Sequence, residues 1–240
     1  MAGGQGSGGS GSRTEEREGL PCGAVRPAAL LFDWDNTLVD TWPAIHHALA
    51  VTFRAMDREP WTFEETRARV RASARDSFPA LFGARAEEAM GIFYRCFEAD
   101  HLAKLRERPG ATDVLERLDA AGLYLAVVSN KRGDLLRQEA DALNWTHLFR
   151  RLVGANDAAQ DKPAVAPVLL ALADGAIAPG PDIWFVGDTD IDLACAVNSG
   201  CAPVLLRAEP PRLGEFADHP PHRYFDSCAA LAEALTAEGG

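Results

Sequence analysis

The sequence predicts an α/β protein: a doubly wound parallel sheet with a small helical domain inserted after the first strand. Continuous apolar runs of strand length, such as residues 28–32, are typical of parallel strands that are covered on both faces. Runs of this kind alternate with helical periodicity over 109–240. Roughly 80 helix-like residues separate the first strand from the second, which is too many for a single crossover helix.

The segments follow in order along the chain. Residues 1–24 are rich in Gly and Ser, and we expect a disordered tail. The core domain is expected over 25–41 and 109–240, with the helical domain over 42–108 between its two parts. Within the helical domain, Pro43 stands at a helix start, and the helix-like stretches are 43–56, 63–74 and 85–105.

Alternation continues through the second part of the core. We expect helices over 112–122, 133–144, 166–175 and 191–200, and strands over 123–130, 148–154, 182–188 and, last, 202–208. Ligands of such sheets bind beyond the carboxyl ends of the strands. Asp33, Ser129 and Asp188 each fall at that end of a strand, so three strands bring polar residues to one edge.

Composition excludes several classes of function. A formal charge of -11 over 240 residues argues against a nucleic-acid or membrane-surface binder. No apolar run reaches the roughly 18 to 20 residues that span a bilayer, and the N-terminus lacks the apolar segment of a signal peptide. The five cysteines are odd in number and form no C-x-x-C pair, which indicates reduced thiols in a cytoplasmic protein.

Asp33 and Asp35 stand two residues apart at the end of an apparently buried strand. Two carboxylates this close repel each other and resist ionisation unless a cation or a shared proton compensates them. The pair therefore predicts a partner of positive charge. Asn36 follows, and Asn is the residue other than Gly that best tolerates a left-handed backbone.

Four segments, FDWDNTLVD, VVSNK, DKP and VGDTDIDLACAVNSG, resemble the four motifs of the haloacid dehalogenase-like (HAD) hydrolases. Their order and spacing resemble the phosphoglycolate phosphatase group, which carries a helical C1-type cap. The resemblance covers roughly residues 28–227. It implies a Rossmann-like core and a Mg2+-dependent phosphatase that hydrolyses a small phosphate monoester, such as phosphoglycolate, through an aspartyl-phosphate.

The resemblance also implies the roles of individual residues. Asp33 matches the nucleophile, Asp35 the acid and base, and Lys162 the lysine that neutralises the transferring phosphoryl group. The metal ligands that it implies are Asp33, the backbone carbonyl of Asp35, Asp188 and Asp192, and those that it implies for the substrate phosphate are Thr37, Ser129 and Asn130.

Other residues and properties leave alternatives open. We hypothesise that Arg75 reads the non-phosphate end of the substrate, and a solvated helix arginine is an equal alternative. Lys131 is as readily a surface lysine as a substrate contact. Asp190 is expected to be exposed or peripheral to the metal site. A sugar phosphomutase remains an alternative function, as does a non-catalytic binding module on the same fold. The expected partner is a small phosphorylated metabolite, and the chain is a monomer or a homodimer.

Overall fold

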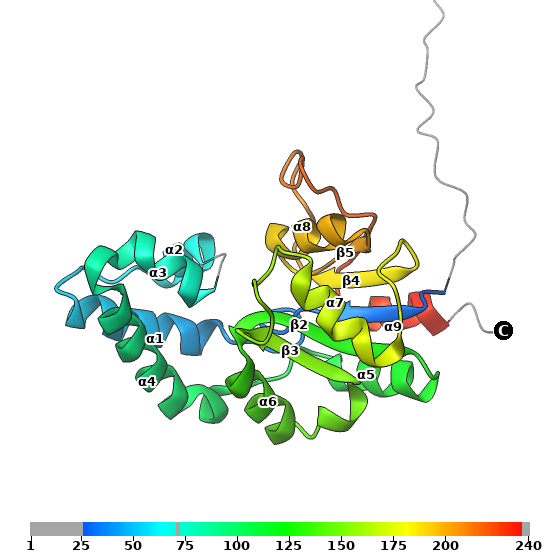
Figure 1. Cartoon of the computed structure of the whole chain (residues 1–240), viewed down its shortest axis with the longest axis horizontal. Coiled ribbons are helices and arrows are strands. Elements are labelled where there is room, and N and C mark those ends of the chain that lie inside the picture. Colours follow the sequence, from blue (N-terminus) through cyan, green and yellow to red (C-terminus); the bar gives the residue numbers. More distant parts are fainter. Residues whose placement is uncertain (1–25, 71–72, 237–240) are drawn as a thin grey trace, which may run out of the picture.

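A computed structural model describes residues 26–70 and 73–236 of the chain (Figure 1). The tail expected over 1–24 lies outside the described residues. A six-stranded sheet with the order β3-β2-β1-β4-β5-β6 forms the core, and every strand pairing is parallel. The predicted fold class is confirmed. The strands are β1 (Ala29–Phe32), β2 (Tyr124–Arg132), β3 (Arg151–Ala155), β4 (Ile183–Gly187), β5 (Ala202–Leu206) and β6 (Arg223–Phe225).

Helices cover both faces of this sheet. They are α5 (Ala111–Ala120), α6 (Gly133–Ala142), α7 (Ala166–Leu172), α8 (Asp190–Ser199) and α9 (Cys228–Thr236), with short 3-10 turns at Thr146–Leu148 and Ala173–Gly175. Side chains alternate along β1. Leu30 and Phe32 therefore pack with α5, α6 and α9, whereas Leu31 packs with α7 and α8. Burial on both faces explains why β1 is a continuous apolar run.

The register places the ends of β1 and β4 beside the interior of β2. Phe32 of β1 lies opposite Val127 of β2 and Val186 of β4. The backbone N–H of Asp33 also donates to the carbonyl of Val186 at 2.8 Å. The residues that follow β1 and β4 therefore lie beside the second half of β2, which carries Ser129.

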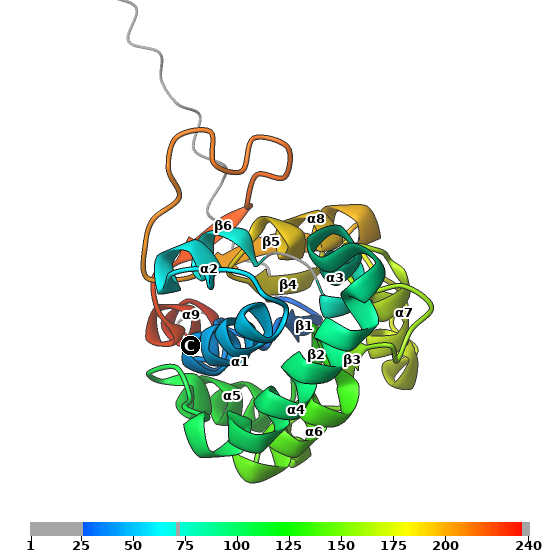
Figure 2. The same ribbon diagram turned by 90° about the vertical axis from the view of Figure 1, so that its left-hand side faces the viewer.

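Four helices form a separate group beside that edge: α1 (Trp42–Ala55), α2 (Phe63–Arg69), α3 (Ala74–Phe82) and α4 (Ala86–Lys104), with a 3-10 turn at Gly83–Arg85. Helices α1, α3 and α4 share an apolar cluster around Leu49, Phe53 and Phe78, and Trp61 and Val70 on either side of α2 pack against it. Viewed from their side, the four helices lie in front of the central strands (Figure 2). We call this group the cap. Its expected limits at 42 and 108 stay a prediction.

Two sequence expectations differ from the structure. The stretch 63–74 does not continue as one helix: α2 ends at Arg69, Val70 is extended, and the Ser73 side chain accepts from the Asp76 N–H at the start of α3. A serine N-cap competes with helix continuation because its oxygen satisfies the new helix's free N–H groups. The strand expected last, over 202–208, is followed by β6 and α9. With three residues, β6 is too short for a periodic signal.

No helix among the described residues combines the length and the apolar character needed to cross a bilayer.

Candidate active site

A lysine and two carboxylates form a buried group at the ends of β1 and β4. Lys162 Nζ lies 2.6 Å from Asp33 Oδ1 and 2.7 Å from Asp192 Oδ1. Burial raises the pKa of Asp33 to about 7, and the negative charges of Asp192 and Asp35 add to this rise while Lys162 opposes it. Burial lowers the pKa of Lys162, but its two carboxylate partners outweigh that effect and raise it overall. One ammonium thus serves two carboxylates.

A third carboxylate makes this group a candidate metal site. One carboxylate oxygen from each of Asp33, Asp188 and Asp192 lies within 4.8 Å of the other two. Burial and the charges of the other two aspartates raise the pKa of Asp188 well above its ordinary value. Three carboxylates against one lysine leave an excess of negative charge, and an all-oxygen donor set is what hard divalent cations prefer. These residues therefore fit a divalent metal ion.

Local backbone geometry holds the aspartates in place. Asn36 has φ 66°, the left-handed conformation that its type tolerates, and so the chain turns sharply after Asp35. The turn brings Thr37 Oγ1 to 3.3 Å from both Asp33 Oδ2 and Asp188 Oδ1. Thr37 of the first motif thus lies between the carboxylates of Asp33 and Asp188, close enough to restrain both.

The start of α8 positions Asp192. Its Oδ2 accepts from the backbone N–H of Thr189 at 3.1 Å and from the Thr189 hydroxyl at 2.9 Å, in a capping box. A Cβ on Gly187 would lie 2.3 Å from the Cβ of Asp192, so only glycine allows this approach. The helix cap leaves Oδ1 of Asp192 for Lys162.

Ser129 and Asn130 lie in the second half of β2 and line the cavity beside the aspartates. The Ser129 hydroxyl oxygen accepts from the backbone N–H of Lys131 at 3.1 Å, which leaves its own hydrogen to donate. Asn130 binds protein: its Oδ1 accepts from the Lys162 N–H at 2.9 Å and its Nδ2 donates to the Lys162 carbonyl at 3.2 Å. The Asn130 side chain therefore ties the Lys162 loop to β2.

Lys131 is buried, which excludes the solvated surface position that the sequence left open. Its Nζ lies 2.6 Å from Asp35 Oδ1 and 2.5 Å from Glu139 Oε2. Burial lowers the pKa of Lys131, and the two carboxylates outweigh it, so that the net shift is upward. Glu139 is fully buried on α6 and also accepts from Trp34 Nε1 at 2.7 Å and contacts His101 Nδ1 at 2.9 Å.

Sequence reasoning missed Glu139 and His101. A signal for Glu139 did exist: residues 135, 136, 139 and 140 share one helix face, and the other three are apolar. A carboxylate in such a buried stripe requires partners. His101 on α4 shows no comparable pattern.

Arg75, for which reading of the substrate's non-phosphate end stays a prediction, contacts the core in the structure. From the first turn of α3, its guanidinium reaches Asp161 Oδ1 at 2.7 Å and Asn156 Oδ1 at 2.9 Å, both in the core. Arg75 does not line the cavity around the aspartates. Asp190 is exposed, as expected, and lies 3.2 Å from His219 Nδ1.

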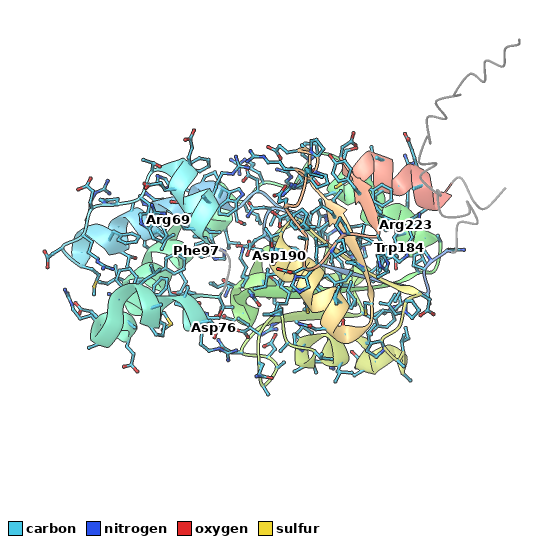
Figure 3. All side chains as sticks on the ribbon, turned by 90° about the horizontal axis from the view of Figure 1, so that it is seen from above. Arg69, Asp76, Phe97, Trp184, Asp190 and Arg223 are labelled. Carbon is cyan, nitrogen blue, oxygen red and sulfur yellow. The ribbon has the colours of Figure 1, made fainter. Side chains whose placement is uncertain are left out.

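A cavity of about 570 Å³ opens above the aspartates and extends among the cap helices. Asp33, Asp188 and Lys162 lie at its core end. In the view from above, Arg69 and Phe97 belong to the cap, and Asp190 lies at the end of the core that faces it (Figure 3). A ligand in this cavity would contact both parts of the molecule.

Residues 30–205 match the protein family described as haloacid dehalogenase-like hydrolase. The chain belongs to this family. It is 31% identical over 224 residues to a phosphoglycolate phosphatase of Caulobacter vibrioides, with 87% of this chain and 92% of the relative covered. The family and this relative show that the HAD-like chain is a phosphatase, and phosphatases of this family generally use a divalent metal ion.

Solved structures agree with this assignment. A HAD-superfamily hydrolase from Ehrlichia chaffeensis is 25% identical, with a TM-score of 0.60 and coverage of 88% of this chain and 97% of that one. A hydrolase from Pseudomonas syringae has a TM-score of 0.75 at 20% identity, with coverage of 88% and 99%, and supports the HAD-like fold alone. The resemblance seen in the four sequence motifs is confirmed.

Proposed function

We propose that this phosphatase hydrolyses a small phosphate monoester through an aspartyl-phosphate on Asp33, with Mg2+ as its metal. The observation that carries the proposal is the buried contact of Lys162 with Asp33 and Asp192 inside a cluster of three carboxylates. Phosphoglycolate is the first candidate substrate because the relatives carry its name.

The first step transfers the phosphoryl group to the protein. A carboxylate oxygen of Asp33 attacks phosphorus, and the ester bond between phosphorus and the substrate oxygen breaks. Asp35 donates its proton to the departing alkoxide, so that a neutral alcohol leaves. The Lys162 ammonium, 2.6 Å from Asp33, offsets the negative charge that this attack brings together.

The second step returns the protein to its starting state. Asp35, now ionised, takes a proton from water, and the water oxygen attacks phosphorus. The bond between phosphorus and Asp33 breaks, which releases inorganic phosphate and restores both carboxyl groups. Ser129 lines the cavity beside Asp33, and the Thr37 hydroxyl lies 3.3 Å from Asp33 Oδ2. We propose that both hydroxyl groups hold phosphate oxygens.

Asp33, Asp188 and Asp192 would hold the metal, with the carbonyl of Asp35 as a further ligand. When bound, Mg2+ would reduce the repulsion between these carboxylates and a phosphate dianion.

A panel of phosphate monoesters, assayed with and without Mg2+, tests this function by the release of inorganic phosphate. Asp33→Asn should abolish release with an unchanged circular dichroism spectrum. The matched control is Asp190→Asn, at an exposed aspartate of the fourth motif, which should stay active. Full activity in Asp33→Asn would disprove the proposed nucleophile. A sugar phosphomutase would instead isomerise a sugar phosphate without release, and a non-catalytic binding module would do neither.

We propose the cytoplasm as the location, because the four described cysteines are free thiols and that compartment keeps thiols reduced. A monomer or a homodimer is equally compatible with this function.

A further inference from the structure

Aromatic side chains dominate the cap end of the active-site cavity. Six line it: Trp42, Trp61, Phe78, Phe93, Tyr94 and Phe97. They come from α1, α3, α4 and the segment between α1 and α2, so the cavity runs from the aspartates into the interior of the cap. Aliphatic side chains, including Ile45, Val70 and Leu81, fill the gaps between the rings.

Much of this lining is only half buried. Trp42, Trp61, Phe93 and Tyr94 each keep part of their surface exposed. Apolar surface in contact with water costs about 25 cal/mol per Å², and a ligand that covers it recovers this free energy. An apolar cavity that opens onto polar groups is the common form of a small-molecule site, and about 570 Å³ lies within the range for a drug-sized ligand.

The cations of the lining already have acidic partners. Arg69 pairs with Glu65 at 2.9 Å, and Arg132 pairs with Asp134 at 2.5 Å. Lys131 and Lys162 are each held between two carboxylates. Among the described lining residues, a second anionic group on the substrate, such as the carboxylate of phosphoglycolate, would therefore have to share a cation that already has an acidic partner. Arg71 lies outside the described residues.

We infer that the substrate is a phosphate monoester of an apolar alcohol, a ring or chain well beyond two carbons. Its phosphate lies at Asp33 and its apolar body lies among the aromatic side chains of the cap. This inference rests on the proposed phosphatase function and replaces phosphoglycolate as its first candidate substrate: the catalytic groups are the same, and the cavity selects the alcohol. Binding of the apolar body helps to desolvate the phosphoryl group beside Lys162.

A series of n-alkyl phosphates from methyl to hexyl, compared with phosphoglycolate at saturating Mg2+, tests the inference. Unbranched alcohols beyond methanol differ little in leaving-group strength, so kcat/KM reports mainly on binding of the chain. We expect kcat/KM to rise about two- to fourfold per added methylene. Phenyl and naphthyl phosphate distinguish a ring-shaped body from a chain.

Two cavity variants and a matched control show whether the dependence of kcat/KM on chain length arises in the cavity. Leu81→Ala should lower kcat/KM for hexyl phosphate far more than for methyl phosphate, which flattens the dependence on chain length. Leu169→Ala, an exposed leucine on α7 outside the cavity, should keep the wild-type dependence. Ala80→Trp adds bulk to the lining without removing packing, and should impair hexyl phosphate far more than methyl phosphate.

The outcomes separate the two proposals. If no monoester releases phosphate, the proposed function fails. If phosphoglycolate is hydrolysed with a higher kcat/KM than hexyl phosphate, or if kcat/KM does not rise along the series, the phosphatase stands and the apolar substrate is wrong. If Leu81→Ala and Ala80→Trp both keep the wild-type dependence on chain length, the apolar body does not bind in the cap.

Discussion

Lys131 Nζ lies 2.6 Å from Asp35 Oδ1, in a buried ion pair at the core end of the cavity. Glu139 holds the other side of the ammonium at 2.5 Å and itself contacts His101 at the C-terminal end of the cap helix α4. A continuous chain of contacts therefore runs from the proposed acid and base to the cap. Because Lys131 is enclosed on both sides, it restrains the direction in which the Asp35 carboxyl group points.

Lys131→Met should impair the substrates that need a proton on their leaving group. We expect kcat/KM for ethyl phosphate to fall about tenfold or more, within the usual range for general acid catalysis, and that for p-nitrophenyl phosphate to change little, because nitrophenolate leaves without a proton. Steady-state kinetics on both substrates check this. An equal loss on both would mean that Lys131 does not act through Asp35.

The same variant leaves Glu139 without its cation, and breaking a buried pair typically costs about 3–5 kcal/mol. Lys131→Met with Glu139→Gln should recover much of this stability, as measured by urea unfolding, and should keep the selective loss on ethyl phosphate. That pattern separates the catalytic effect from the structural one.

Removing the metal should abolish phosphate release and lower stability. Mg2+ at about 100 times its dissociation constant should stabilise the folded state by about 2.7 kcal/mol, because the unfolded chain lacks the site. Asp188→Asn should lose most of this stabilisation, while Asp190→Asn should keep it. Thermal unfolding with EDTA or Mg2+ measures both. An equal response of the two variants would contradict the assigned ligands.

Arg75→Ala should loosen the contact between cap and core. It removes the 2.7 Å partner of the Asp161 carboxylate, whose side chain is 2% exposed, and leaves its Oδ1 with the Asn156 N–H at 3.2 Å. Loss of a hydrogen bond to a charged group costs about 1.5–3 kcal/mol. Adding Asp161→Asn to Arg75→Ala should restore part of the lost stability. A double-mutant cycle of unfolding free energies measures this. Were Arg75 instead a reader of the substrate, KM would rise for some monoesters and not for others.

Glu215 should make stability depend on pH. Its hydrogen bonds from Arg207 lower its pKa to about 2, against a smaller upward effect of burial. In the unfolded chain the pKa of Glu215 is near 4.5. Below that pH the unfolded chain gains a proton that the folded chain does not, so the stability that Glu215 contributes falls as the pH falls. Glu215→Gln should cost roughly 1 kcal/mol at pH 7. The cost should shrink below pH 4.5 in urea unfolding, and a cost independent of pH would exclude the pair.

Much of the core followed from the sequence. Parallel strands buried on both faces read as continuous apolar runs, and β1, β2 and β4 were therefore visible as strands. Polar residues directly after such runs meet at one edge, because parallel strands carry their ends in the same direction. The convergence of Asp33, Ser129 and Asp188 needed no further information.

Other features depended on how distant helices pack. Lys131 follows Asn130 in a motif, and its neighbours along the chain do not indicate that it is buried. Its environment comes from Glu139 on α6, from His101 on α4 and from the turn after β1, which the fold brings together. Arg75 likewise reads as a surface helix arginine until the cap is placed against Asp161.

The sequence by itself determined that polar residues follow the apolar strands, where the acidic motifs lie, and the family. These depend on local periodicity and on spacing along the chain. Only the tertiary structure decided which charges pair, and that aromatic side chains of the cap face the aspartates across a cavity. The physical reason is that burial and Coulomb interactions depend on distances in space, and those distances are set by packing between segments that are far apart in sequence.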